Sequence, residues 1–507
     1  MEKQSFIPHK LKDFLIKEEE IMQNKKTANT AEDVVKKKTA AQVQGKEKDS
    51  NGSTASGKSI KNLSSIPDFD MILGQGVHYS RDDYRTKLNN NVCVVGTSGA
   101  GKTRSIVKPN LMQASGSYVV SDPKGNLARE LGPYLEKKGY DVVRMDFIHP
   151  EKSVGYNPLD YCRTTQEIQQ LAHLLVYEMN MQENNASRPI DPFWDEATLI
   201  LLMSLLAYIK ESDDISEEEK NLSMLSKLIR ESKCKNEKGK SVSYSINDCA
   251  RNTSLDYRME EHRHKAAKRG TTSWAVERYD DYNVAPNRTF YTINITSLAK
   301  LATFDTPEIR KMIARTGFDF RKVGQKPMAV FVEVSDTDRS LDILVNLFYS
   351  QLMNELCRFA DEECKDSRLP IPVQFILDDF ATNARIGNFQ NMIANIRSRG
   401  ISAMIMLQSE AQLKAYYGDN AQTIIDNCNT YVYMGGSNPE QAKLVGKRAN
   451  KIDTTILNMP IGKCWVFRRG QEPILCDNFD LEAFRREKGL VKEELDESDL
   501  DIEGRFA

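Results

Sequence analysis

The sequence lacks the residue patterns of several protein classes. Its nine cysteines include no C-x-x-C pair, and its six histidines show no metal-ligand spacing. Scattered cysteines of odd number argue against a disulfide framework and suit a reducing compartment. The net charge of −2 leaves no global basic surface for nucleic acid. Any contact with nucleic acid must therefore come from local patches or from a ring of subunits.

The chain also lacks a long apolar run. The longest, Leu199 to Ile209, has eleven residues, which is too short to cross a bilayer, so we expect a buried core helix. The first residues are polar and lysine-rich, which predicts no secretory signal. His262 and His264 flank Arg263 in a charged stretch, and we expect them on a solvated helix. These features together predict a soluble, cytoplasmic chain.

The most informative stretch that is present runs from Val92 to Thr103, VCVVGTSGAGKT. An apolar run leads into the spacing G-x-x-x-x-G-K-T, which predicts a strand, a glycine loop and a helix that is interrupted or ends near Pro109. Glycines let backbone N–H groups surround phosphate oxygens, Lys102 adds positive charge near the β and γ phosphates, and Thr103 is placed to ligate Mg²⁺. The alternative is a plain glycine turn before a helix. The residues predicted to bind a nucleoside triphosphate are Gly96, Thr97, Ser98, Gly99, Ala100, Gly101, Lys102 and Thr103.

A second match to the same spacing lies at Gly52 to Ser59 (GSTASGKS). The residues before it, GKEKDSN, are polar and charged and cannot form a buried strand. Without a strand this loop has no rigid frame, so we interpret it as linker.

Composition and periodicity divide the chain into four parts. Residues 1–65 are polar and low in large apolar groups, which predicts a flexible segment. Alternating strands and helices in 66–161 and 287–485 predict a parallel, helix-covered sheet. Helical periodicity and dense charge in 162–286 predict an inserted all-α domain. Residues 486–507 form an acidic tail that we also expect to be flexible.

Short apolar or β-branched runs mark the expected strands of the sheet. They lie at 92–95, 117–120, 140–145, 288–293, 328–334, 373–377, 401–407, 430–434 and 464–467. Helices are expected at 127–138, 296–301, 341–361, 389–398 and 439–446.

Paired carboxylates follow the predicted strand Val373 to Leu377. Asp378 and Asp379 come at its C-terminal end, where parallel sheets bind ligands. We expect Asp378 to hold Mg²⁺ through water and Asp379 to polarise the attacking water, as hydrolysis of a bound triphosphate requires. Two solvated carboxylates at a strand end are the alternative.

Further candidates lie around the next strand, Ile401 to Leu407. Gln408 ends this strand and is a candidate to sense the γ-phosphate or to orient water, against the alternative of an ordinary polar strand end. Arg397 and Arg399 precede the strand. A guanidinium at a subunit edge can reach a neighbour's γ-phosphate in a ring, although such arginines are usually surface residues.

With these residues in place, the chain resembles the type IV coupling proteins of bacterial conjugation, the TraG type, over roughly Ile72 to Phe479. An ordered series of motifs carries the resemblance, which makes it more specific than any one motif. The series is Gly96–Thr103 with Pro109-Asn110-Leu111, Ser121–Gly125, Tyr156–Leu159, Phe193-Trp194 with Ala197, Ile376–Ala381, and Gln408-Ser409 with Gln412-Leu413.

The resemblance implies an α/β fold: a RecA-like P-loop nucleotide-binding domain with a central, mostly parallel sheet and an inserted all-α domain. It implies a homo-hexameric ATPase that uses ATP and Mg²⁺ to move single-stranded DNA with its relaxase towards a type IV secretion channel. Arg397 falls near the family's trans-acting arginine. The implied catalytic residues are Lys102, Asp378, Asp379, Gln408 and Arg397, with Thr103 and Asp378 at the metal.

Two departures from the family pattern matter. Family members usually begin with transmembrane helices, and we identify none here. We therefore expect either a separate membrane-anchor partner, with the chain peripheral at the inner face of the plasma membrane, or an anchor that has been removed. Asp379 stands where Glu is usual, which puts the rate of hydrolysis in doubt.

A different class of function stays open. An ATP-binding adaptor would recruit protein cargo to a secretion channel without moving DNA, with the helical insertion and the acidic tail as its working surfaces. If the chain does contact DNA, candidate patches are the lysine-rich N-terminus and the basic run Arg263 to Arg269, although both are more often solvated faces.

Overall fold

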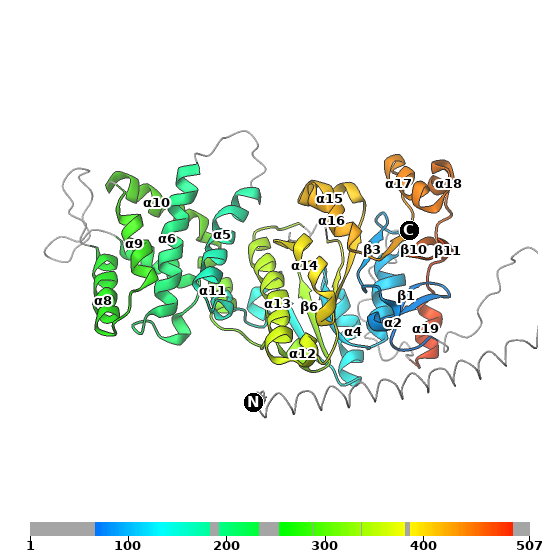
Figure 1. The fold of residues 1–507 in the computed structure, drawn as a ribbon, viewed down its shortest axis with the longest axis horizontal. Coiled ribbons are helices and arrows are strands. Elements are labelled where there is room, and N and C mark those ends of the chain that lie inside the picture. Colours follow the sequence, from blue (N-terminus) through cyan, green and yellow to red (C-terminus); the bar gives the residue numbers. More distant parts are fainter. Residues whose placement is uncertain are drawn as a thin grey trace, which may run out of the picture. The chain divides into compact units, whose positions relative to one another are not determined.

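The computed structural model describes residues 66–182, 192–232, 253–285, 287–335, 337–380 and 386–489 (Figure 1). All of these belong to one compact unit. The predicted flexible segment 1–65, with the glycine loop at Gly52, lies outside the described residues, as do Ala381 and residues 490–507 of the predicted tail.

The described residues form a central sheet of nine strands in the order β11-β10-β9-β3-β8-β7-β4-β6-β5. The pairs from β9 to β5 are parallel, and the β9–β10–β11 edge is antiparallel. This confirms the predicted mostly parallel sheet. The strands are β3 (Val92–Val95), β4 (Ser117–Ser121), β5 (Asp141–Asp146), β6 (Met328–Glu333), β7 (Val373–Leu377), β8 (Ile401–Leu407), β9 (Thr430–Tyr433), β10 (Lys463–Arg468) and β11 (Ile474–Asp477). A hairpin of β1 (Asp70–Gly74) and β2 (Val77–Ser80) precedes them.

The central strands are mostly apolar because helices cover both faces of the sheet. β3, β4, β6 and β7 are buried throughout. Cys93 and Val95 point to one core, and Val92 and Val94 point to the other. The first core is covered by α13 (Asp342–Glu363), α14 (Phe389–Asn395), α15 (Glu410–Tyr417), α16 (Asn420–Asp426) and α17 (Pro439–Ala449). The second is covered by η2 (Thr103–Val107), α3 (Lys108–Met112), α4 (Asn126–Lys137) and α19 (Leu481–Glu487).

The segment between β5 and β6 is helical where it is described. Its helices are α5 (Thr165–Gln182), α6 (Pro192–Glu211), α7 (Ser223–Glu231), α8 (Ser254–Lys268), α9 (Trp274–Asn283), α10 (Asn287–Lys300), α11 (Pro307–Ile313) and α12 (Lys322–Gln325). The strand predicted at 288–293 is wrong, because these residues lie in α10. Phe290, Ile293, Asn294 and Ser297 are buried with helical spacing, and this tertiary burial overrides the β-propensity of the local sequence. The predicted domain boundaries stay a prediction.

α6 contains the run predicted as a core helix, and residues 201–209 are all buried. Among the described helices, α6 is the one whose length and composition would suit a membrane span, but 67% of its most apolar window is buried inside the fold. His262 on α8 is also buried, against our expectation. Its ring packs edge-on against Tyr208 of α6, and its Nε2 lies 3.2 Å from a carboxylate oxygen of Glu211. His264 is exposed, as predicted.

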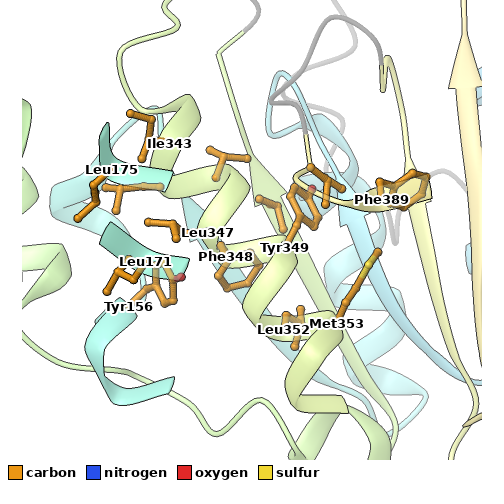
Figure 2. Close-up of a cluster of buried hydrophobic side chains, with 14 of the residues drawn as sticks. Tyr156, Leu171, Leu175, Ile343, Leu347, Phe348, Tyr349, Leu352, Met353 and Phe389 are labelled. Atoms are coloured by element: carbon orange, nitrogen blue, oxygen red, sulfur yellow. The ribbon is translucent and has the colours of Figure 1, made fainter. Parts of the chain in front are cut away.

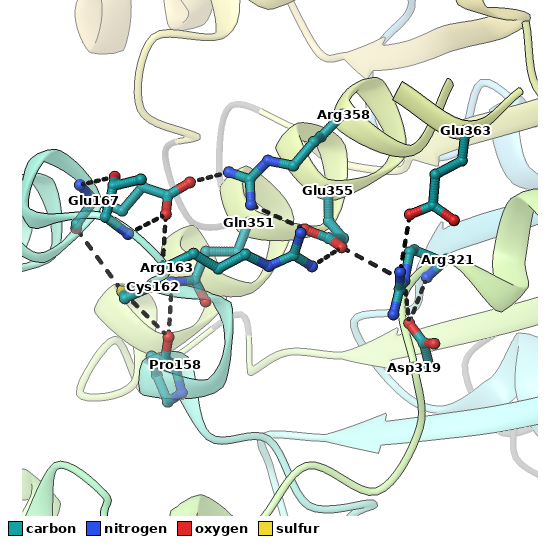
Figure 3. A network of polar contacts seen from close by, with 11 residues as sticks. Pro158, Cys162, Arg163, Glu167, Asp319, Arg321, Gln351, Glu355, Arg358 and Glu363 are labelled. Carbon is teal, nitrogen blue, oxygen red and sulfur yellow. Dashed lines mark hydrogen bonds and ion pairs between the residues drawn. The ribbon is translucent and has the colours of Figure 1, made fainter. Parts of the chain in front are cut away.

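α13 links the helical segment to the sheet. Figure 2 shows Phe348 of α13 beside Tyr156, with ring centroids 5.3 Å apart, and Leu171 of α5 on the same side. Glu355 lies seven residues after Phe348 on α13. Its side chain is 3% exposed and contacts three guanidinium groups (Figure 3). They belong to Arg163, Arg321 and Arg358, which lie on separate segments of the chain. These charge-assisted contacts connect the segments that carry Arg163 and Arg321 to α13.

Candidate nucleotide-binding site

The predicted phosphate loop, residues 96–103, lies at the C-terminal edge of the sheet between β3 and η2. Gly99 (φ 78°) and Gly101 (φ 88°) adopt left-handed backbone that other residues rarely adopt. The base of the loop is fixed, since the N–H of Gly96 donates to Leu407 O at 3.0 Å. The N–H groups of Gly99 and Gly101 have no backbone acceptor among the described residues. They are therefore open to an anion.

The helix that follows the loop begins as a widened, π-helical turn. Pro109 has no N–H to donate to the carbonyl four residues earlier, and the N–H of Lys108 instead reaches Thr103 O. The helix therefore continues through Pro109 into α3. Asn110 fixes α3 to β1: its Nδ2 donates to Ile72 O at 2.7 Å and its Oδ1 accepts from Ile72 N at 3.0 Å.

Lys102 lies over its own loop. Its Nζ is 2.7 Å from Gly96 O and 3.3 Å from Thr97 O, and the residue is 7% exposed. Among the described residues, no carboxylate lies within ion-pair distance of this ammonium. A buried cation held only by neutral carbonyl groups is a strong site for phosphate.

Asp378 ends β7, which is separated from β3 by β8 alone. Its Oδ2 accepts a hydrogen bond from Thr103 Oγ1 at 2.6 Å, and Ser121 Oγ donates to its carbonyl oxygen at 3.2 Å. Burial raises the pKa of Asp378 above the usual value; Thr103 and Lys102 oppose this effect, and Asp379 adds to it. The structure thus brings together the two residues predicted at the metal.

Asp379 lies beside Asp378 in a left-handed conformation (φ 48°), which Asp tolerates better than most residues. Its N–H donates to Asp378 Oδ1 at 3.1 Å. The next residue, Phe380, is buried and stacks on Tyr417 with ring centroids 5.6 Å apart. This aromatic contact fixes the turn that carries both carboxylates.

Gln408 ends β8, between the strands that carry the loop and Asp378. Its Oε1 accepts from Gln412 Nε2 at 3.4 Å. Two residues further on, Glu410 accepts hydrogen bonds from Arg448 (2.6 Å) and Tyr431 (2.7 Å). Although burial opposes it, these donors hold the pKa of Glu410 below its usual range. This buried network holds the start of α15 and with it Gln408.

Arg397 lies at the opposite edge of the sheet, in the η8 turn (Arg397–Arg399) before β8. The seven residues of β8 put roughly 20 Å between this turn and the phosphate loop. Arg397 Nη2 donates to Asp83 O at 3.1 Å, and Arg368 binds the Asp83 carboxylate at 2.8 Å. The structure does not bring Arg397 together with the other predicted site residues of the same chain.

Sequence reasoning missed Asn478, which follows β11. Its Nδ2 donates to Ala100 O in the phosphate loop at 3.2 Å. β11 runs parallel to β3, because two antiparallel pairings separate it from β9. The rule that located Asp378, a polar residue directly after a strand, applies here too, but β11 is short and mostly exposed and no strand was predicted there.

The site gathers open N–H donors, an ammonium group, a hydroxyl and a carboxylate around one loop. Donors of this kind suit a polyphosphate, and the two oxygen ligands suit a hard divalent cation. Together with the order of the strands, they define a RecA-type P-loop fold.

Comparison with known proteins agrees with this class. The family model described as type IV secretory system conjugative DNA transfer matches residues 19–455. The chain belongs to this family, as the motif series predicted.

VirD4 of Agrobacterium fabrum (strain C58) is 24% identical over 367 residues, which are 70% of this chain. The chain spans about half the length of this curated relative, 48%. The bacterial conjugative coupling protein TrwBΔN70 in complex with sulphate aligns over 80% of this chain and 89% of its own, with a TM-score of 0.56 and 14% identity. TrwB in complex with ADP and Mg²⁺ has the same coverage and TM-score at 13% identity. At such identities the likeness shows the fold.

Proposed function

We propose that the chain binds ATP and Mg²⁺ at residues 96–103 and hydrolyses ATP to drive conjugative DNA transfer. The 2.6 Å hydrogen bond between Thr103 Oγ1 and Asp378 Oδ2 carries this proposal. It joins one oxygen from the phosphate loop and one from an acidic strand end, which are the ligands that Mg²⁺ prefers. The solved complex of TrwB with ADP and Mg²⁺ supports the same ligands.

The loop residues bind and orient the nucleotide. The N–H groups of Gly99 and Gly101 donate to phosphate oxygens, and Lys102 exchanges its two carbonyl partners for the β and γ phosphates. Thr103 binds Mg²⁺ directly and Asp378 through water. When bound, the cation neutralises charge on the triphosphate.

Asp379 and Gln408 act on the attacking water. Asp379 directly follows Asp378 in the turn before Phe380, which supports a role for its carboxylate in accepting a proton from the attacking water. Gln408 lies at the end of the strand between the loop strand and β7, so its amide orients the same water and senses the γ-phosphate.

Arg397 acts on the nucleotide of a neighbouring subunit in a homo-hexameric ring. Two observations support this role: the residue lies far from its own loop, and its side chain is 42% exposed. Its charge then stabilises the γ-phosphate of the neighbour as the bond breaks.

The ring recruits and moves single-stranded DNA with bound relaxase into a type IV secretion channel, and a membrane-anchor partner holds it at the inner face of the plasma membrane. The basic run on α8 gives this step little support. Arg263 pairs with Asp280, Lys265 with Asp214, and Arg269 with Asp213. We therefore expect DNA to bind where subunits together focus positive charge.

A DNA-stimulated ATPase assay tests the proposal. We expect single-stranded DNA to raise the rate of ATP hydrolysis by the oligomer, with a stimulation that falls steeply as salt is raised. Lys102→Ala should remove both the basal and the stimulated rates.

The outcomes separate the two functions. Hydrolysis without stimulation by DNA, in an oligomer verified by light scattering, would contradict DNA translocation and favour a cargo adaptor. No nucleotide binding at all would contradict both functions.

A further inference from the structure

Two thiols lie opposite each other at the edge of the sheet. Cys464 on β10 and Cys476 on β11 are direct partners in the antiparallel register, and their Sγ atoms are 3.4 Å apart. Residues paired in this way have Cα atoms about 4.5–5.5 Å apart, which a disulfide can span. A disulfide measures about 2.05 Å between sulfur atoms, so a small rotation of the two side chains would close it.

The surroundings of this pair leave room for the sulfur atoms. A Cβ at Gly74 would lie 2.5 Å from Cys476 Sγ, so glycine at this position of β1 makes space for the thiol. Cys464 is buried, whereas Cys476 on the edge strand is partly exposed. Of the two residues, we therefore expect Cys476 to react first with a small reagent.

The same strand contacts the phosphate loop. Asn478 lies two residues after Cys476, and its Nδ2 donates to Ala100 O. Its N–H donates to Gly462 O at 2.7 Å, which fixes it to the turn before β10. A change in the distance between β10 and β11 therefore moves a residue that binds the loop.

We propose that Cys464 and Cys476 form a reversible disulfide by exchange with a low-molecular-weight disulfide, and that this bond weakens nucleotide binding through Asn478. The first part stands on the thiol geometry alone. The second part rests on the proposed ATP site.

The exchange balances as two steps. The Cys476 thiolate attacks one sulfur of the small disulfide, forms a mixed disulfide and releases one small thiol. The Cys464 thiol then loses its proton and attacks Cys476 Sγ, which releases the second small thiol. Two protein thiols are oxidised, the small disulfide is reduced, and both protons end on the released thiols.

The hydrogen bond between the two thiols supports this order of attack. A bond from Cys464 lowers the pKa of Cys476, while the same bond and burial raise the pKa of Cys464. The more accessible sulfur is thus also the better nucleophile at neutral pH.

Closing the disulfide brings the two Sγ atoms from 3.4 Å to about 2.05 Å, and we expect the resulting shift of Cys476 to weaken the hydrogen bond that Asn478, two residues further on, makes to the loop. The free energy of one such bond corresponds to about fivefold in an equilibrium constant, which is the largest effect that its loss can have on the ordering of the loop for ATP. We therefore expect the oxidised protein to bind ATP about fivefold more weakly than the reduced protein, and dithiothreitol to restore the affinity.

The experiment has two arms on the full chain. In the first, the protein is incubated with glutathione disulfide, free thiols are trapped with N-ethylmaleimide, and tryptic peptides are mapped by mass spectrometry. We expect a linked Cys464–Cys476 peptide in the wild type and in the control Cys357→Ser, and none in Cys476→Ser. In the second, the affinity of a fluorescent ATP analogue is measured for wild type, Cys476→Ser and Cys464→Ala, before and after oxidation.

The two arms fail separately. Absence of the linked peptide at millimolar glutathione disulfide would overturn the proposal, whatever the nucleotide result. An equal loss of affinity on oxidation in Cys476→Ser would assign the effect to another cysteine and overturn the coupling. No ATP binding by the reduced wild type would refute the proposed nucleotide site and the coupling to it, and would leave the thiol exchange to be judged by the first arm. The comparison of oxidised with reduced wild type needs no substitution. The proposal can therefore be tested even if a cysteine variant fails to fold.

Discussion

Polar groups gather at both ends of the parallel strands, the C-terminal edge and the N-terminal edge of the sheet, but they differ in whether they are paired within the chain. At the C-terminal edge, Lys102 is held by neutral carbonyls only, and the N–H donors of the phosphate loop are open. At the N-terminal edge, Arg368 and Arg397 share the carboxylate of Asp83, which is 8% exposed. The Lys102 ammonium at the first edge has no carboxylate partner among the described residues, whereas Arg368 and Arg397 at the second edge share one.

This difference teaches how one sheet can serve two tasks. A ligand site keeps donors unpaired, because pairing within the chain would compete with the ligand. At a surface that meets another subunit, charged side chains can be paired within the chain before contact. On contact, they can exchange these partners for charged groups of the other subunit. The cavity at the N-terminal edge, about 180 Å³ and lined by Arg81, Arg397 and Gln374, therefore does not replace the loop as the candidate nucleotide site.

The largest effect is expected from Lys102→Ala at the C-terminal edge. Loss of the ammonium that lies over the loop should remove ATP binding and reduce hydrolysis to background. Isothermal titration and a phosphate-release assay measure the two effects. Lys108→Ala is the matched control on the following helix, since Lys108 pairs with Glu130 away from the loop. Equal effects of the two changes would contradict a specific role of Lys102 in nucleotide binding.

Arg397→Ala tests the N-terminal edge. We expect ATP affinity to stay within about twofold, because the residue does not reach its own loop, and hydrolysis by the assembled ring to fall about 1000-fold, as for other trans-acting arginines. Steady-state ATPase rates above and below the assembly concentration measure this. Arg368→Ala removes the other partner of Asp83 and should leave the rate within about tenfold. Equal losses of the ATPase rate in both variants would show that Arg397 acts only through its ion pair with Asp83.

Asp379→Asn separates binding from chemistry within the C-terminal edge. Asn tolerates the left-handed backbone as Asp does, so the turn should persist. We expect kcat to fall about 100-fold through loss of the base, with ATP affinity unchanged. Single-turnover and equilibrium binding measurements distinguish the two. Unchanged turnover would move the base to another residue.

The smallest effect concerns the pH dependence of stability at Asp378. Because burial raises its pKa, the folded protein holds this proton more tightly than the unfolded chain, and stability falls as pH rises through the raised value. Asp378→Asn removes this cost, so its Tm without nucleotide or Mg²⁺ should exceed that of wild type at pH 7. The gain should shrink as the pH approaches 3.8, the ordinary value. Thermal unfolding at several pH values tests this, and a lower Tm for the variant at pH 7 would contradict it.

Much of the sheet could be predicted from the sequence because its strands are buried on both faces and form nearly continuous apolar runs, as at Val92 to Val95. The strand prediction for 288–293 was wrong because the β-branched and aromatic residues of this segment suit a strand. In the structure, they lie in a helix whose residues are buried with helical spacing. The prediction that His262 is exposed was wrong for the same reason. The charged local sequence predicted exposure, but the residues that cover the ring, Tyr208 and Glu211, lie far away along the chain. Tertiary contacts decided both cases.

The loop and its acidic partners were predictable because each follows a strand, and parallel strands end at one edge. Thr103 and Asp378, 275 positions apart, meet as that rule requires. Asn478 was not predictable, since the direction of β11 depends on two antiparallel pairings. The structure leaves the trans role of Arg397 a prediction, because it concerns a second copy of the chain.

β8 connects the two edges as a single rigid element. Arg397 lies in the turn before it and Gln408 directly after it, and six of its seven residues are fully buried. A close-packed strand neither stretches nor compresses appreciably. In the proposed ring, a displacement of the turn at Arg397 would therefore shift Gln408 by a similar distance, and β8 would transmit movement from one end of the sheet to the other.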